Sequence, residues 1–210
     1  MKINELKDMF IAVADKIIQS EDMLTKIDLQ IGDGDHGTGM ALGFKNVKKE
    51  LERRKIDYAE DVFKIIGMTL LDTMGGASGV LFGTVFISGI TSRTPHTEIE
   101  LQDFAEIFRK SLEALKKRGK AKCGDKTMVD AFEPAVFALE ESVEKKLSLK
   151  EGTANAAAAA ESGMENTKKY RAKFGRAKYF GDNAIGLQDA GATSIWLIFQ
   201  EIADWVNVHE

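Results

Sequence analysis

The chain has 210 residues, 44% of them hydrophobic, and a net charge of −4 from 29 Lys and Arg against 33 Asp and Glu. There is no basic excess of the kind that indicates nucleic-acid or anionic-membrane binding, so we expect neither as a partner, and the length predicts one domain over residues 1–210. The single Cys123 cannot form an internal disulfide, the charged N-terminus is unlike a signal peptide, and no apolar run reaches about 18 residues, so we expect a cytoplasmic protein that does not span a membrane.

Eight segments have apolar residues three and four positions apart, the spacing of an amphipathic helix. In chain order they lie near 6–17, 40–51, 59–74, 78–92, 101–115 and 127–145, then after Ser148 and after Asp189. Pro134 should bend the sixth helix, and Ser148 with Glu151 has the spacing of a capping box. The alanine-rich stretch 152–160 predicts close helix packing. Since strand-like alternation is nearly absent, we predict an all-α fold.

The loops between these helices form two groups of different composition. The even-numbered loops contain no glycine, whereas the odd-numbered ones are glycine-rich and lie at 32–37, 75–79, 119–128 and 175–192. If short loops make consecutive helices antiparallel, the odd-numbered loops meet at one end of the bundle. Carboxylates, free backbone N–H groups and cationic side chains would then form a nucleotide or polyphosphate site. Helix capping explains each glycine equally well when it is taken alone.

Asp28, just before the first of these loops, and Asp33 and Asp35 within it are candidate metal ligands. Oxygen-only ligands favour Mg²⁺ or Ca²⁺, and Mg²⁺ usually keeps open positions for substrate phosphate. The loop is not an EF-hand, because Gly37 and Phe44 would occupy positions 5 and 12, where that motif needs oxygen ligands. The alternative is an Asx-turn or a helix N-cap without metal. Neither a Walker loop nor the glycine-rich loop of protein kinases is present.

The four glycine-rich loops resemble, in order and spacing, the ADP-binding L subunit of dihydroxyacetone kinase and the matching C-terminal domain of single-chain dihydroxyacetone kinases. The shared motifs are Asp28 with Gly-Asp33-x-Asp35-His-Gly, then Gly-Gly-Ala-Ser-Gly, then Gly-Lys-Ala with Gly-Asp-Lys-Thr-Met, and finally Gly-Arg-Ala with Ile-Gly-x-Gln-Asp-x-Gly-Ala-Thr. The resemblance implies an eight-helix antiparallel barrel that holds ADP or ATP at one mouth through two Mg²⁺ ions.

The resemblance also implies a role for individual residues. The metal ligands would be Asp28, Asp33 and Asp35; the phosphates would contact His36, Gly37, Thr38, Gly39, Ala77, Ser78 and Arg176; the nucleoside would contact Gly119 and Met128; and Asp189, Ala190 and Gly191 would lie near the ribose. Four of these have a local alternative: His36 as a solvated cap, Met128 as a core residue, Arg176 as a surface cation and Asp189 as the N-cap of the last helix.

In the family that the chain resembles, the ketose and the residues that act on it belong to a separate K subunit. This division fits the lack of a convincing general base or sugar pocket here, so we expect no catalytic residue in this chain and treat Cys123 as a spacer. The nucleotide is either ADP kept as a coenzyme and recharged by a phosphotransferase-system protein, or exchanging ATP. The chain length and His36 favour the coenzyme form, whereas Gly34 and Ala190 replace the usual Ala and Pro of that form.

Three alternative functions follow from the same residues. The chain could serve a kinase for another short ketose. It could be a non-catalytic, nucleotide-bound regulatory module that docks on a transcription factor or a kinase. A Ca²⁺-binding helical scaffold is the third alternative, and it would require tight Ca²⁺ binding without nucleotide.

Overall fold

The computed structural model describes all residues, 1–210, and contains nine α-helices and no strand apart from an isolated bridge between Lys2 and Glu98. The α-helices are α1 Ile3–Gln19, α2 Glu21–Ile31, α3 His36–Arg53, α4 Ala59–Thr73, α5 Gly76–Ile87, α6 Leu101–Gly119, α7 Val129–Glu144, α8 Leu149–Asn166 and α9 Ala190–His209. Three 3₁₀ segments, η1 Ser88–Ile90, η2 Thr167–Lys169 and η3 Arg176–Ala184, complete the structure. The prediction of an all-α fold is confirmed, and no helix combines the length and apolar character that a bilayer crossing requires.

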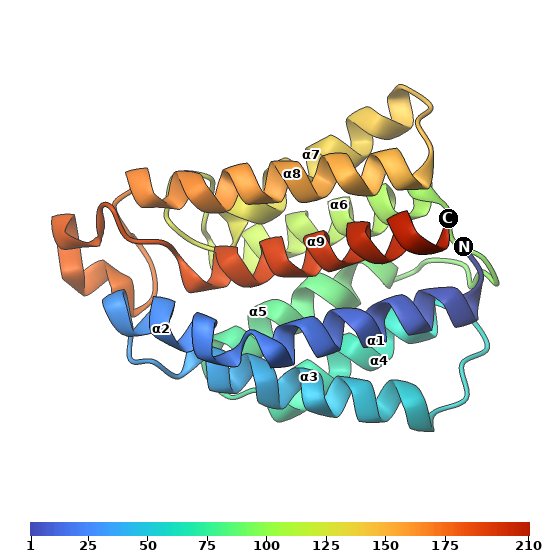
Figure 1. Ribbon diagram of the computed structural model, residues 1–210, viewed down its shortest axis with the longest axis horizontal. Coiled ribbons are helices and arrows are strands. Elements are labelled where there is room, and N and C mark those ends of the chain that lie inside the picture. Colours follow the sequence, from blue (N-terminus) through green and yellow to red (C-terminus); the bar gives the residue numbers. More distant parts are fainter.

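The helix α2 was missing from the eight predicted helices. The backbone breaks at Ser20, whose hydroxyl donates to the carbonyl of Lys16 at 2.8 Å, and α2 then continues along the same side of the molecule (Figure 1). Only Leu24 and Ile31 of α2 are buried, so its apolar period is too weak to be recognised. Because α1 and α2 together take the place of one predicted helix, the order of the remaining loops is unchanged.

The helices form a closed ring. Each helix from α3 to α9 packs against the next, and α1 packs against both α3 and α9. A cluster of 49 buried apolar residues draws on all nine α-helices. At its centre Phe108 contacts the rings of Phe63, Phe104, Phe132 and Phe199, with centroids 5.2 to 6.2 Å apart. Side chains therefore fill the middle of the ring.

In the C-terminal half of this ring, a capping box fixes the start of α8 and small residues allow close helix packing, as the sequence predicts. The hydroxyl of Ser148 accepts from the N–H of Glu151, and the Glu151 carboxylate accepts from the N–H of Ser148, which confirms the capping box of α8. Ala156 and Ala160 are fully buried, and a Cβ on Gly163 would lie 2.1 Å from the carbonyl oxygen of Asp130. The small residues of α8 thus allow its close approach to α7.

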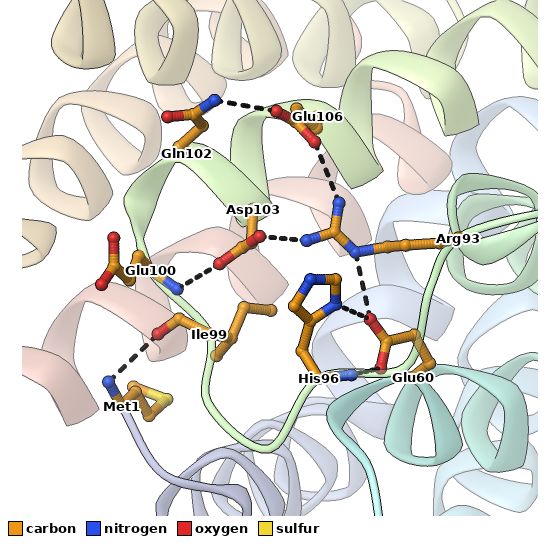
Figure 2. Close-up of polar contacts among 9 residues, drawn as sticks. All are labelled: Met1, Glu60, Arg93, His96, Ile99, Glu100, Gln102, Asp103 and Glu106. Carbon is orange, nitrogen blue, oxygen red and sulfur yellow. Dashed lines mark hydrogen bonds and ion pairs between the residues drawn. The ribbon is translucent and has the colours of Figure 1, made fainter.

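The two ends of the ring differ in their chemistry. Both termini lie at one end (Figure 1), where Arg93 donates to Glu60, Asp103 and Glu106 and joins the start of α4 to α6 (Figure 2). His96 also donates its backbone N–H to Glu60, at 2.8 Å. The four glycine-rich loops lie at the other end, as their numbering predicts. A set of ion pairs therefore holds one end together, while the loops with unusual chemistry share the other.

Candidate functional site

The loop from α2 to α3 gathers three carboxylates. Asp28, in the last turn of α2, accepts from the N–H of Gly34 at 2.8 Å and from the N–H of His36 at 3.4 Å. This fold needs Gly34, whose φ is +78°, and it needs Gly32, because a Cβ there would lie 2.2 Å from Oδ1 of Asp28. Asp28, Asp33 and Asp35 each offer an oxygen within 4.8 Å of the other two. The structure thus brings the three predicted metal ligands together.

The carboxylates carry more negative charge than their surroundings neutralise. The nearest cation is Arg176 in η3, whose Nε lies 2.6 Å from a carboxylate oxygen of Asp33. Partial burial, followed by the charges of Asp33 and Asp28, raises the pKa of Asp35, and Arg176 offsets only part of this effect. An oxygen-only donor set with excess negative charge fits a hard divalent cation, so the residues present suit Mg²⁺.

The first turn of α3 follows this loop directly. The Thr38 hydroxyl donates to the carbonyl of Asp35 at 2.9 Å, within the turn that starts the helix. His36 is buried, and its Nε2 lies 2.8 Å from the hydroxyl of Ser194 in α9. Burial lowers the pKa of His36, while the charge of Asp28 and a hydrogen bond with the Ala190 backbone act in the opposite direction, so the imidazole is neutral at pH 7. The alternative of His36 as a solvated cap is therefore wrong.

Glycines at the site fall into two kinds. A Cβ on Gly37 would lie 2.2 Å from the hydroxyl of Thr25 and 2.3 Å from the carbonyl of Glu21, so Gly37 lets α2 and α3 cross closely. A Cβ on Gly39 or on Gly75 would meet no atom within 4 Å, and neither residue has a positive φ. Neither packing nor backbone conformation explains a glycine at these two positions. Gly75 is the N-cap of α5, and Gly39 closes the first turn of α3 by donating its N–H to the carbonyl of Asp35. Both glycines therefore border helix N-termini, where the N–H groups without an intrahelical partner favour anions.

The second glycine-rich loop contains the start of α5, and the third begins at the end of α6. Ala77 is exposed and Ser78 is half-buried in the first turn of α5, just after Gly75 and Gly76. A Cβ on Gly119, the last residue of α6, would lie 3.5 Å from the side chain of Leu81 in α5. The structure therefore places the end of α6 beside α5.

The start of α9 packs against the third loop. Asp189 caps α9 by accepting from the N–H of Ala192 at 2.7 Å, and desolvation raises its pKa to about 7. Ala190 is buried, and a Cβ on Gly191 would lie 3.5 Å from Cβ of Met128, itself part of the core. The local alternatives for Met128 and Asp189 thus describe their places in the structure. Contact of these residues with a nucleoside stays a prediction.

Several polar residues of this end were missed by the sequence-based prediction. Ser194 is fully buried against His36, Lys126 is buried within the third loop, and Asp130 is buried in the first turn of α7. No local pattern marks their burial: Lys126 lies inside the Gly-Asp-Lys-Thr-Met motif with no role assigned to it, and Ser194 and Asp130 lie just beyond recognised motifs. Cys123 lies in the same loop; desolvation, followed by the neighbouring Glu133, raises its pKa to about 12. The thiol is therefore protonated at neutral pH, in agreement with its role as a spacer.

Comparison with known proteins identifies relatives over most of the chain. The family model of the DAK2 domain matches residues 30–204. The PEP-dependent dihydroxyacetone kinase, ADP-binding subunit DhaL, of Escherichia coli (strain K12) is 40% identical over 180 residues, 86% of either chain. The PTS-dependent dihydroxyacetone kinase, ADP-binding subunit DhaL, of Lactococcus lactis subsp. lactis (strain IL1403) is 35% identical over 192 residues, which cover 91% of this chain and 92% of that protein.

A solved structure has a similar fold. The dihydroxyacetone kinase from C. freundii in complex with AMP-PNP and Mg²⁺ superimposes with a TM-score of 0.75 at 25% sequence identity. The match covers 95% of this chain but only 33% of that kinase chain, so the chain spans about a third of the larger protein.

Proposed function

Because the chain belongs to the DAK2 domain family, we propose that it is the ADP-binding subunit of a dihydroxyacetone kinase, a phosphotransferase, with residues 1–210 as a single nucleotide-binding domain. One observation carries the proposal: three carboxylates within 4.8 Å of one another share an end of the ring with Arg176 and two helix N-termini that have unfilled space above a glycine. A diphosphate with its metal needs these groups at one place.

In this proposal Asp28, Asp33 and Asp35 hold two Mg²⁺ ions. Bound there, the metal would neutralise the charge of the phosphates and make phosphoryl transfer easier. The N–H groups at the starts of α3 and α5 bind phosphate oxygens, with Gly39 and Gly75 leaving room for close approach. Arg176 adds a cation that can pair with phosphate as it pairs with Asp33.

The residues of this chain position the nucleotide and do not activate the acceptor. His36 is buried and neutral, with its Nε2 engaged by Ser194, so it stabilises the start of α3. Asp189 is occupied as a helix cap. We therefore propose that dihydroxyacetone binds to a separate K subunit that supplies the acid–base residues, and that phosphoryl transfer between the subunits depends on positioning and electrostatic stabilisation.

The relatives support the coenzyme form of the nucleotide. The E. coli and L. lactis proteins are named PEP-dependent and PTS-dependent, and the chain matches them over at least 86% of their length. We accordingly propose that ADP stays bound and is rephosphorylated in place by a phosphotransferase-system protein of the cytoplasm. Exchange of ATP, or a different short ketose as acceptor, is the alternative within the same reaction class.

Mass spectrometry of small molecules released from freshly purified protein tests the nucleotide site. We expect ADP at close to one equivalent, retained through dialysis with Mg²⁺ and lost with a chelator. Lys55→Ala, which changes an exposed residue at the opposite end of the ring, should retain the same amount. Mixing with a K subunit and a phosphoryl donor should then phosphorylate dihydroxyacetone, whereas binding of ADP without any transfer would favour the regulatory module.

A further inference from the structure

Lys126 is the only lysine or arginine among the buried residues, with 1% of its surface exposed. It stands in the loop between α6 and α7 with a φ of +59°, in the left-handed region that a non-glycine residue rarely adopts. Burying an ammonium group costs free energy unless it is paired and hydrogen-bonded. The structure therefore keeps a cation here at two separate costs, one of desolvation and one of backbone conformation.

The ammonium group of Lys126 binds two backbone carbonyls. It donates to the carbonyl of Thr167 at 2.7 Å and to the carbonyl of Leu187. The charged groups that face it are the carboxylates of Asp189 and Asp130. Burial lowers the pKa of Lys126, and these two carboxylates act against that effect. Because the group is enclosed by protein on all sides, it does not itself reach the phosphate position.

The two carbonyls, of Thr167 and Leu187, lie directly before and after a single segment that connects α8 to α9, residues 168–186, which we call the excursion. Two further hydrogen bonds join the two ends of this segment, and we call the closure that they form the neck. Gly186 N–H donates to the carbonyl of Lys168 at 2.7 Å, and Asp189 N–H donates to the hydroxyl of Thr167 at 3.1 Å. Lys126 is the residue from outside the excursion that binds both of its ends.

Beyond the neck the excursion has few attachments. It includes η3, most of whose side chains are exposed. It contacts the rest of the protein through the backbone and side chain of Lys173, both bound to Asp125, and through Arg176 with Asp33. Phe174 also packs against the main core, and Ala172 and Ala184 form a small apolar cluster with Ile31. The part of the segment that carries Arg176 is mostly exposed, so its position relative to the aspartate loop depends on these attachments together with the geometry of the neck.

We propose that Lys126 is a positioning residue for the phosphate site, which closes the neck of segment 168–186 and thereby holds Arg176 beside Asp28, Asp33 and Asp35. The inference rests on the proposed nucleotide function, since the position of Arg176 matters for binding only if phosphate binds there. Lys126 acts through Arg176 without contacting the ligand.

The variant Lys126→Met tests this, because it keeps the length of the side chain and removes its donors. In the full-length, nucleotide-free protein we expect tryptic cleavage within 168–186 to become at least tenfold faster while the helices stay resistant. The dissociation constant for Mg·ADP should rise at least tenfold. Lys117→Met, an exposed lysine in the last turn of α6 with no ion-pair partner, is the matched control and should change neither value.

A double-mutant cycle separates positioning from general destabilisation. If Lys126 acts through Arg176, Lys126→Met should weaken Mg·ADP binding by less than twofold in an Arg176→Gln background. Equal losses in both backgrounds would overturn the proposal. Thr167→Ala opens the same neck without exposing a buried charge, and Thr167→Ser should restore it, so these variants decide the matter if Lys126→Met does not fold. Unchanged cleavage and affinity in Thr167→Ala would then refute positioning by the neck.

The two proposals fail in different ways. If the wild-type protein does not bind Mg·ADP, the proposed function is wrong, and the positioning role falls with it. If the wild type binds Mg·ADP and Lys126→Met opens segment 168–186 with no loss of affinity, the function stands and the positioning role is refuted.

Discussion

Gly39→Ala should make the protein more stable and make nucleotide binding weaker. Gly39 lies inside α3 with an ordinary helical backbone, and a Cβ there would meet no atom within 4 Å. Alanine in a helix is more favourable than glycine by about 0.5–1 kcal/mol, which corresponds to a rise in Tm of roughly 1–4 °C for a chain of this size. In the nucleotide-bound protein the added methyl group would occupy the space above the N-terminus of α3.

The loss of affinity follows from the hydrogen bonds that the methyl group would displace. One backbone N–H bond to a charged phosphate oxygen contributes about 1.5–3 kcal/mol, so the dissociation constant for Mg·ADP should rise by roughly 10- to 100-fold. Urea unfolding without nucleotide measures the first effect, and titration calorimetry with Mg·ADP measures the second.

Gly37→Ala is the matched comparison, two residues earlier in the same turn. Its Cβ would overlap the hydroxyl of Thr25 and the carbonyl of Glu21, so we expect a loss of stability of about 1–3 kcal/mol. If Gly39→Ala bound Mg·ADP as tightly as the wild type, the open space above α3 would have no part in binding phosphate. If it were as destabilised as Gly37→Ala, the assignment of open space would be wrong.

Three further variants test other parts of the structure. Asp33→Asn should reduce Mg²⁺-dependent retention of ADP at least tenfold with an unchanged helical circular dichroism spectrum, because it removes charge from the loop and leaves the core intact; retention equal to that of the wild type after dialysis would contradict the metal site. Asp189→Asn keeps an acceptor for the N–H of Ala192 but no longer titrates. The pKa of Asp189 is raised from 3.8 to about 7, so between these values the folded protein holds a proton that the unfolded chain has released. The stability that Asp189 contributes is therefore present below about pH 4 and is lost as the pH rises through 7. Between pH 5 and pH 8 the free energy of unfolding of the variant should therefore rise relative to that of the wild type, by on the order of 1–3 kcal/mol in urea unfolding without nucleotide. A difference in stability that does not depend on pH would refute this. Phe108→Ala should cost about 3–5 kcal/mol in the same assay, because its ring contacts four other aromatic rings, and a loss below about 1 kcal/mol would show that the cavity collapses.

The sequence by itself determined most of the helices and the family. Apolar residues at helical spacing mark the buried face of each long helix, and capping boxes such as Ser148 with Glu151 mark where a helix begins, so both can be recognised from neighbouring residues alone. The order of the glycine-rich loops was sufficient to predict that they share one end. The helix α2 escaped detection because only two of its residues face the core.

Only the tertiary structure decided which residues of the motifs have which role. Gly37 and Gly39 look alike in the sequence, yet one lies against α2 and the other borders open space. Arg176 lies beside Asp33, and Lys126 lies beneath Thr167, because the packing of the helices brings distant loops together. Local patterns record how a segment relates to the core, since burial repeats with the helix period. Contacts between distant residues depend on helix packing angles and loop paths, which no stretch of sequence encodes by its own periodicity.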